Sequence, residues 1–174
     1  KKSDTILRYN KEAIVINSFS KYFCMTGWRL GWIIAPNNII NVIEKLSMSL
    51  FLCPSTLAQL IATKAFDDYN ILDTNVAIYK KNRDFLINFF EDKGLYNYAS
   101  PDGAFYLYID ISSISDNSSD LALRLLNEEG VSVTSGEDFD YKSGKKYIRI
   151  SYGGDYREIT EATKKINNWL KINK

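Results

Sequence analysis

The chain has 174 residues, of which 45% are hydrophobic and 25% charged, an ordinary composition for a globular protein. Its 22 basic and 21 acidic residues give a net charge of +1, so it lacks the basic surface expected of a protein that binds nucleic acid or an anionic membrane. It contains no histidine, which excludes histidine-based catalysis and histidine metal sites within this chain.

Two further absences narrow the class of protein. No apolar run approaches the roughly 20 residues that cross a bilayer, so we expect a soluble, cytoplasmic protein. The two cysteines, Cys24 and Cys53, are too few and too far apart for a zinc or iron–sulfur motif, and we expect no metal site. Because both lie among apolar residues, we expect them to be reduced, buried thiols.

The first half of the chain is rich in helix-forming patterns. Residues 13–16 and 30–35 are short apolar runs that predict two buried strands. A helix that begins at residues 36–38 is predicted next. After a break at Cys53-Pro54-Ser55, the spacing of apolar residues predicts two more helices, over 56–69 and over 73–93, the second closed by Gly94.

From Tyr96 onwards the pattern changes to mixed helix and strand. A strand over 103–111 precedes a polar loop that can cap a helix over 120–129, which Gly130 ends. The remaining elements predicted are strands over 131–134 and 147–152 and an amphipathic helix over 156–172. We therefore place a domain boundary within or just after the long helix, with domains at residues 1–80 and 81–174.

Residues 18 to 29 contain the chain's best candidate for a reactive site. Lys21 and Arg29 fall between the first two predicted strands, where loops carry reactive groups. A lysine attacks an aldehyde only as the free amine, and a nearby positive charge lowers a lysine pKa. Arg29 can supply that charge and also grip a phosphate, while Ser18 and Ser20 add neutral donors. The alternative is that both cations are solvated charges at strand ends.

A second candidate lies in the predicted strand over residues 147–152. Strand periodicity places Ile148 and Ile150 on one face and Arg149 on the other. A planar guanidinium is well suited to grip a carboxylate through two parallel hydrogen bonds. Taken alone, Arg149 could equally be an edge-strand arginine that faces water.

Together these segments resemble the class I/II aminotransferases of the aspartate aminotransferase superfamily, which are fold type I pyridoxal-phosphate enzymes. The matching pattern is Ser-x-Ser-Lys followed by Gly-x-Arg-x-Gly, formed by Ser18, Ser20, Lys21, Gly27, Arg29 and Gly31. Two weaker markers, at residues 54–59 and 101–106, follow in the order that the family requires. The resemblance implies that Lys21 forms the Schiff base with pyridoxal 5'-phosphate and moves the substrate's α-proton. It also implies that Ser18, Ser20 and Arg29 hold the phosphate and that Arg149 holds the substrate's α-carboxylate.

The resemblance also implies the architecture and the partners. We expect an α/β protein in which a remnant of the large-domain sheet with its helices is followed by a small α+β domain. Members of the family are roughly twice as long, so we interpret the chain as a C-terminal portion that lacks most of the cofactor platform. We expect that portion alone to be inactive and to self-associate through exposed apolar strands. The whole enzyme would be a homodimer that acts on an amino acid and a 2-oxo acid.

Two other functions stay open at this point. A pyridoxal-phosphate-dependent β-lyase or cyclopropane-forming synthase would share these motifs. The isolated chain could also be a non-catalytic α+β interaction module. The segment over residues 47–54 contains no arginine that could receive a dicarboxylate side chain, which disfavours strict aspartate specificity of that kind.

Overall fold

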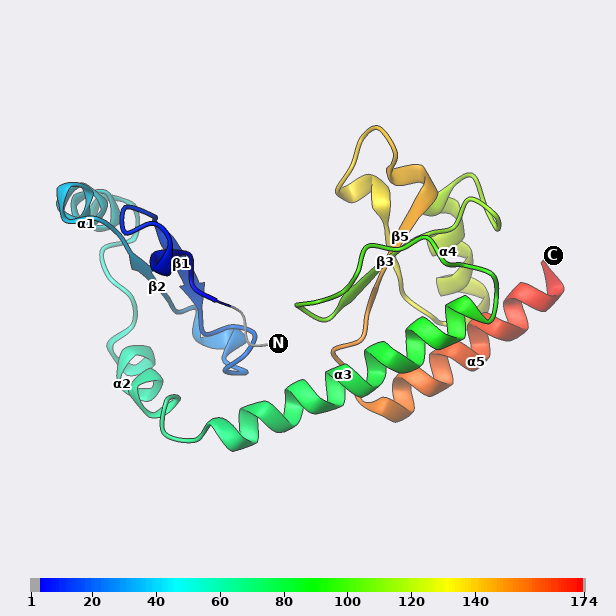
Figure 1. Ribbon diagram of the computed structural model, residues 1–174, viewed down its shortest axis with the longest axis horizontal. Helices are drawn as coiled ribbons and strands as arrows, with labels where there is room; N and C mark the ends of the chain where they lie inside the picture. The colour runs from blue at the N-terminus through cyan, green and yellow to red at the C-terminus, as the bar shows by residue number, and fades with distance from the viewer. Residues whose placement is uncertain (1–3, 174) are drawn as a thin grey trace. The chain divides into compact units, whose positions relative to one another are not determined.

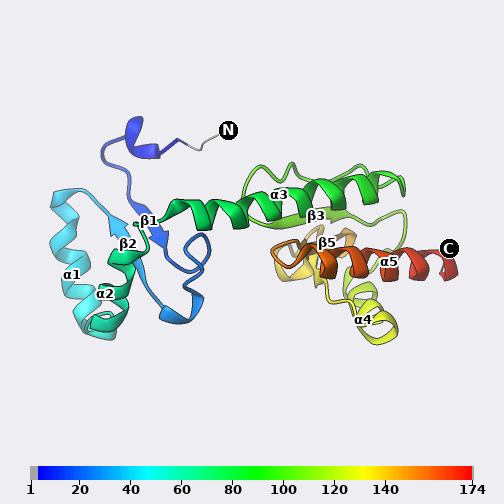
Figure 2. The ribbon, with the colours of Figure 1, turned by 90° about the horizontal axis from the view of Figure 1, so that it is seen from below.

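The computed structural model describes residues 4–173, which form two compact units. The boundary lies within one long helix, α3 (Tyr69–Glu91), between Thr74 and Asn75. Figures 1 and 2 show the elements of each unit from two directions. Within the described residues no helix is both long enough and apolar enough to cross a membrane.

The first unit is built around a two-stranded antiparallel sheet. Strand β1 (Val15–Ser18) pairs with β2 (Gly31–Ile34) so that Ser18 lies opposite Gly31 at the loop end. A Cβ atom on Gly31 would lie 2.5 Å from the carbonyl oxygen of Asn17, so this close pairing requires glycine. The other elements are η1 (Ile6–Arg8), η2 (Thr26–Trp28), α1 (Asn37–Phe51), α2 (Thr56–Lys64) and the start of α3.

Three expectations for this unit were wrong in detail. Strand β1 begins two residues later than predicted, whereas the exposure of apolar strand residues was expected for this portion and is seen at Ile16, which is 75% exposed. Helix α2 ends at Lys64 instead of continuing to residue 69. Helix α3 begins earlier than predicted because the carboxylate of Asp68 accepts a hydrogen bond from the Asn70 amide at 2.9 Å and starts the new helix there.

The second unit contains a three-stranded antiparallel sheet with the order β3-β5-β4. Its strands are β3 (Tyr106–Asp110), β5 (Tyr147–Ser151) and β4 (Thr134–Ser135). Strand β4 is shorter than predicted because the amide of Val131 donates to the carbonyl of Leu125 at the end of the preceding helix instead of to the sheet. The helices are α4 (Ser118–Glu129), α5 (Tyr156–Ile172) and the later part of α3, alongside which α5 runs in Figures 1 and 2.

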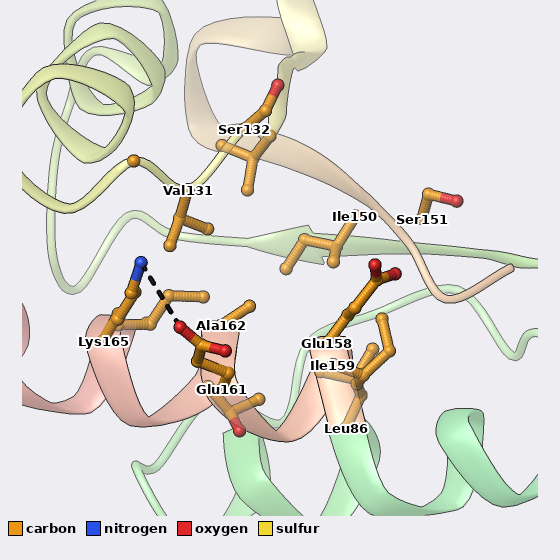
Figure 3. A pocket seen from close by; sticks show the side chains of 14 residues that line it. Leu86, Val131, Ser132, Ile150, Ser151, Glu158, Ile159, Glu161, Ala162 and Lys165 are labelled. Atoms are coloured by element: carbon orange, nitrogen blue, oxygen red, sulfur yellow. Dashed lines mark ion pairs between the residues drawn. The ribbon is translucent and has the colours of Figure 1, made fainter. Parts of the chain in front are cut away.

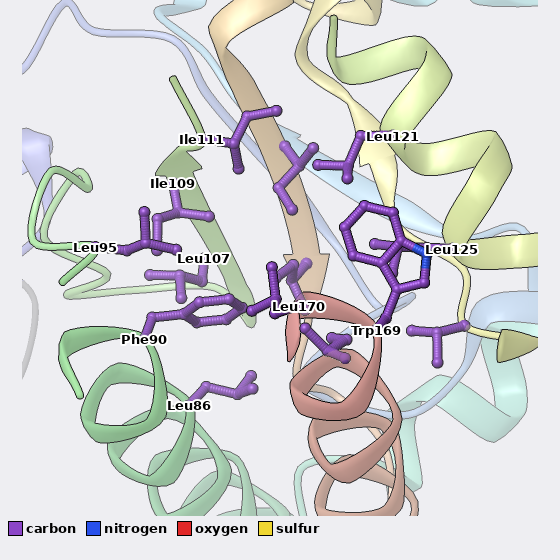
Figure 4. Packing of buried hydrophobic residues seen from close by; sticks show 14 of the residues in the cluster. Leu86, Phe90, Leu95, Leu107, Ile109, Ile111, Leu121, Leu125, Trp169 and Leu170 are labelled. Atoms are coloured by element: carbon purple, nitrogen blue, oxygen red, sulfur yellow. The ribbon is translucent and has the colours of Figure 1, made fainter. Parts of the chain in front are cut away.

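The core of the second unit lies between the sheet and its helices. Alternate strand residues are buried, as the predicted face of Ile148 and Ile150 requires. Figure 4 shows Phe90 of α3 and Trp169 and Leu170 of α5 pointing toward the strands. The opposite sheet face therefore stays open to polar and aromatic side chains, and Arg149 lies on it.

Helix boundaries in this unit follow the capping signals of the sequence. The Asn117 side chain accepts from the amides of two residues in the first turn of α4, and Gly130 ends that helix in the left-handed conformation at φ 67°. Asp155 caps α5 in the same way. Helix α3 does not bury apolar residues alone, because Asn82 is fully buried while Val76 is 48% exposed.

Candidate active site

The loop between β1 and β2 carries four of the five predicted site residues. Ser18 is the last residue of β1, and its hydroxyl accepts a hydrogen bond from the Ser20 amide at 3.0 Å. The Lys21 carbonyl accepts from the Cys24 amide at 3.0 Å, which closes a tight turn. The Lys21 side chain is exposed. Backbone bonds therefore fix the start of the loop.

Phe19 anchors this loop because its side chain is buried in the small hydrophobic cluster of the first unit. Its side chain is only 6% exposed, although both neighbours are more open. The ring contacts Phe23, Trp32 and Phe66 at centroid distances of 5.0, 4.8 and 5.6 Å. Its amide donates to the Leu30 carbonyl and its carbonyl accepts from the amide of Met25. Burial of this aromatic residue holds the polar residues on either side of it at the surface.

Arg29 ends the η2 turn in a strained conformation. Its φ is +51°, in the left-handed region that few residues other than glycine adopt. The guanidinium donates from Nη1 to the Thr26 carbonyl at 2.7 Å, and the side chain is exposed. Because a guanidinium has five N–H donors, this bond leaves donors that could serve an anion.

Tyr22 is a neighbour that the sequence pattern did not single out. Its hydroxyl donates to Asp73 Oδ1 at 2.7 Å, and this hydrogen bond raises the pKa of the tyrosine. The ring lies 6.4 Å from that of Tyr69. The bond joins the residue after Lys21 to the first turns of α3, a separation of 51 positions that no local motif could reveal.

The expectation of buried cysteines was wrong. Cys24 and Cys53 are both exposed. Cys53 follows Phe51 and Leu52, which are themselves 59% and 78% exposed, so apolar neighbours in sequence did not bring burial. Cys24 lies in the exposed loop with a positive φ of 56°.

Arg149 lies at the centre of the open face of the second sheet. It pairs with Tyr108 of β3 on one side and Thr134 of β4 on the other. The guanidinium carbon is 4.4 Å from the ring centroids of both Tyr106 and Phe139. Among the described residues it makes one hydrogen bond to a side chain, and that bond is long, 3.4 Å from Nη2 to Thr134 Oγ1. No carboxylate of residues 4–173 forms an ion pair with Arg149, so most of its donors are unused by side chains.

Tyr108 completes the aromatic surroundings of Arg149. Its ring stacks on that of Tyr147 at 5.0 Å with an interplanar angle of 7°. The hydroxyl is buried without a hydrogen-bond partner, and this burial, with a smaller effect of Asp140, raises the tyrosine pKa. Strand register places Tyr106 and Tyr108 on the same sheet face as Arg149, so the alternation of the strand residues could have identified both tyrosines. Phe139 lies in a loop, where no such alternation exists.

The five predicted residues thus form two groups. Ser18, Ser20, Lys21 and Arg29 share one loop of the first unit. Arg149 belongs to the second unit.

A separate cavity of about 410 Å³ lies within the second unit, between α5 and the segment that leads into β4. Figure 3 shows Val131 and Ile150 on one side and Ile159 and Ala162 on the other, with the Lys165–Glu161 ion pair of 3.7 Å at its margin. None of the five predicted site residues lines this cavity.

Comparison with known proteins matches the chain to one family. Residues 5–166 match the family described as aminotransferase class I and II. The chain is 38% identical over 163 residues to valine–pyruvate aminotransferase of Mycobacterium tuberculosis, and 36% identical over 162 residues to (5-formylfuran-3-yl)methyl phosphate transaminase of Methanocaldococcus jannaschii. Each alignment covers 92% of this chain and 42% of the relative, so the chain spans about two fifths of the length of these curated relatives.

The fold is likewise that of an aminotransferase. The crystal structure of an aminotransferase from Mycobacterium tuberculosis superposes with a TM-score of 0.94 at 36% identity, over 98% of this chain and 44% of that one. The expected α/β class, as part of the fold type I transferase fold, is therefore confirmed. With the family match extending over most of its length, the chain belongs to the class I and II aminotransferases.

Proposed function

We propose that the full-length protein is a pyridoxal-5'-phosphate-dependent aminotransferase that moves an amino group between an amino acid and a 2-oxo acid. The observation that carries the proposal is that one family match spans residues 5–166 and so includes both the lysine loop and Arg149. Because the chain spans 42% of the length of its relatives, the activity is proposed for the whole protein.

The donor set of the β1–β2 loop fits the cofactor. The loop offers two hydroxyls and a guanidinium with unused donors, which suit a phosphate, and an exposed lysine amine, which suits an aldehyde. When bound, pyridoxal 5'-phosphate supplies the aldehyde and a ring that takes up electrons from the substrate's α-carbon. We assign Ser18, Ser20 and Arg29 to the phosphate.

Lys21 has two roles in this proposal. Its Nζ would hold the cofactor's aldehyde as a free amine. The same amine would be the base that takes up and returns the proton of the substrate's α-carbon. The turn closed by the Lys21 carbonyl supports both roles, because it fixes the backbone while the side chain stays exposed.

Arg149 supplies the grip for the α-carboxylate. Its guanidinium has no acidic partner among the described residues and only one long side-chain bond. A carboxylate could therefore bind through two parallel hydrogen bonds without displacing an ion pair. We assign no side-chain specificity to the substrate. We further propose a cytoplasmic homodimer.

The decisive experiment measures amino transfer by the purified full-length protein, with a panel of L-amino acids and either pyruvate or 2-oxoglutarate as acceptor. We expect transfer that Lys21→Ala abolishes and that the matched control Lys11→Ala leaves unchanged, since Lys11 is also exposed but lies outside the loop. Elimination products without amino transfer would favour a β-lyase instead. If the protein binds the cofactor but forms neither the transfer product nor the elimination product, the proposal is contradicted.

A further inference from the structure

Among residues 4–173, no carboxylate forms an ion pair with Arg149. A long arginine side chain has many rotamers, and proteins commonly fix one with a carboxylate. Here the guanidinium lies 4.4 Å from two ring centroids and, within the described part of the chain, makes a single 3.4 Å bond to a side chain. Aromatic rings attract a guanidinium without neutralising its charge and without using its N–H donors. The rings of Tyr106 and Phe139 therefore leave Arg149 able to bind an anion.

Phe139 is an exposed ring held in a fixed place. It is 53% exposed, yet it contacts the ring of Tyr108 edge-on at 6.5 Å and 83°. Its amide donates to the Gly136 carbonyl at 3.0 Å. A Cβ atom on Gly136 would lie 2.5 Å from the Gly144 carbonyl oxygen, so the two ends of this loop touch backbone to backbone. The tight packing of the loop therefore keeps an apolar ring at the surface, where the guanidinium of Arg149 lies against it.

Serine hydroxyls brace the same loop from α4. The hydroxyl of Ser118, which is fully buried, bonds to Ser135 Oγ at 2.8 Å and to the Gly144 carbonyl at 2.9 Å. Ser135 Oγ in turn accepts from the Glu137 amide at 3.2 Å. These bonds fix both ends of the loop that carries Phe139, so the position of its ring is determined by the fold.

We propose that Tyr106 and Phe139 are positioning residues that hold the Arg149 guanidinium ready for a carboxylate. The proposal rests on the proposed function, in which Arg149 binds the substrate's α-carboxylate. The rings touch neither substrate nor cofactor in this role. The rings restrict the side chain of Arg149 before a carboxylate binds. Less conformational entropy is then lost on binding, so the affinity for the carboxylate is higher.

The test compares ring-removing and ring-keeping variants of the full-length protein. Phe139→Leu removes the ring, Phe139→Tyr keeps it, and Tyr141→Leu is the matched control, because Tyr141 lies in the same loop and is fully exposed. The probe is ¹³C-labelled acetate, whose line width reports binding. We expect Phe139→Leu to weaken acetate binding about 2- to 30-fold. Phe139→Tyr and Tyr141→Leu should stay close to the parent protein.

A second readout tests the geometry without any ligand. The NMR signal of the Arg149 Nε–H group should be displaced by ring currents in the parent protein. It should move toward its position in an unfolded chain in Phe139→Leu, but not in Tyr141→Leu. An unmoved signal in Phe139→Leu would overturn the positioning role, whatever the acetate result.

Arg149→Lys separates the two proposals. Loss of acetate binding in Arg149→Lys with unchanged binding in Phe139→Leu would leave the proposed function standing and refute the role of the ring. Unchanged binding in Arg149→Lys would instead refute the role of Arg149 in the proposed function. Tyr106→Leu is expected to weaken acetate binding as Phe139→Leu does, and Tyr106→Phe, which keeps the ring, is not.

Discussion

Replacing Asn82 by alanine tests how the strand that carries Arg149 is tied to helix α3. Asn82 is fully buried, and its Nδ2 donates to the carbonyls of Tyr152 and Gly154, both at 2.9 Å. These two carbonyls lie in the connection between β5 and α5. The alanine variant removes both donors, so it takes a hydrogen bond from the buried carbonyl of Tyr152 and from the part-buried carbonyl of Gly154.

The expected cost follows from these bonds. Each net hydrogen bond is worth about 1 kcal/mol, and an acceptor left buried without a partner adds about 1–3 kcal/mol. The Oδ1 atom of Asn82 has no partner in the native state, so its removal returns part of that cost. We therefore expect Asn82→Ala to destabilise the second unit by about 2–4 kcal/mol.

Hydrogen exchange measures this loss in the unit concerned. At 1.4 kcal/mol for each factor of ten, the amides of Ile148 and Ile150 should exchange about 30- to 700-fold faster in Asn82→Ala. Asn88→Ala is the matched control, since Asn88 is exposed on the same helix and its replacement should change stability by less than about 0.5 kcal/mol. Equal exchange in the two variants would refute the reasoning.

Three further predictions concern the same unit. Gly136→Ala places a carbon 2.5 Å from a backbone carbonyl oxygen and should lower the melting temperature by at least about 4 °C; an unchanged value would contradict the tight loop. Tyr108→Phe removes a buried hydroxyl without a partner, so denaturant unfolding should show stability unchanged or raised by up to about 1 kcal/mol, not lowered. Hydrogen bonds from Arg124 and then Trp169 lower the pKa of Glu128, so its contribution to stability is complete above its ordinary pKa of 4.5 and is lost as the pH falls through the lowered value. Trp169→Phe removes one donor and should make melting less sensitive to pH in that acid range.

Local patterns in the sequence predicted what depends on local physics. The apolar runs on either side of Lys21 became β1 and β2, and Lys21 lies between them. Strand alternation placed Arg149 on the sheet face away from the buried Ile148 and Ile150. Gly130 ended its helix in the left-handed conformation that only glycine adopts readily.

Contacts between distant segments were not predictable in the same way. Phe139 lies ten positions before Arg149, in a loop with no regular period, so no pattern placed its ring against the guanidinium. Exposure of Cys53 was missed because an apolar sequence indicates a preference for burial and not the presence of a partner surface. The hydrogen bond of Tyr22 with Asp73 depends on where α3 begins, which the sequence placed four residues late.

Location of the cofactor's attachment point tests the central claim most directly. The full-length protein is incubated with pyridoxal 5'-phosphate, reduced with borohydride and digested, and the modified peptide is identified by mass spectrometry. We predict a single modified lysine, Lys21, which lies in the loop after β1. Modification of another lysine instead, or equal modification of Lys21 and the exposed Lys11, would contradict the account.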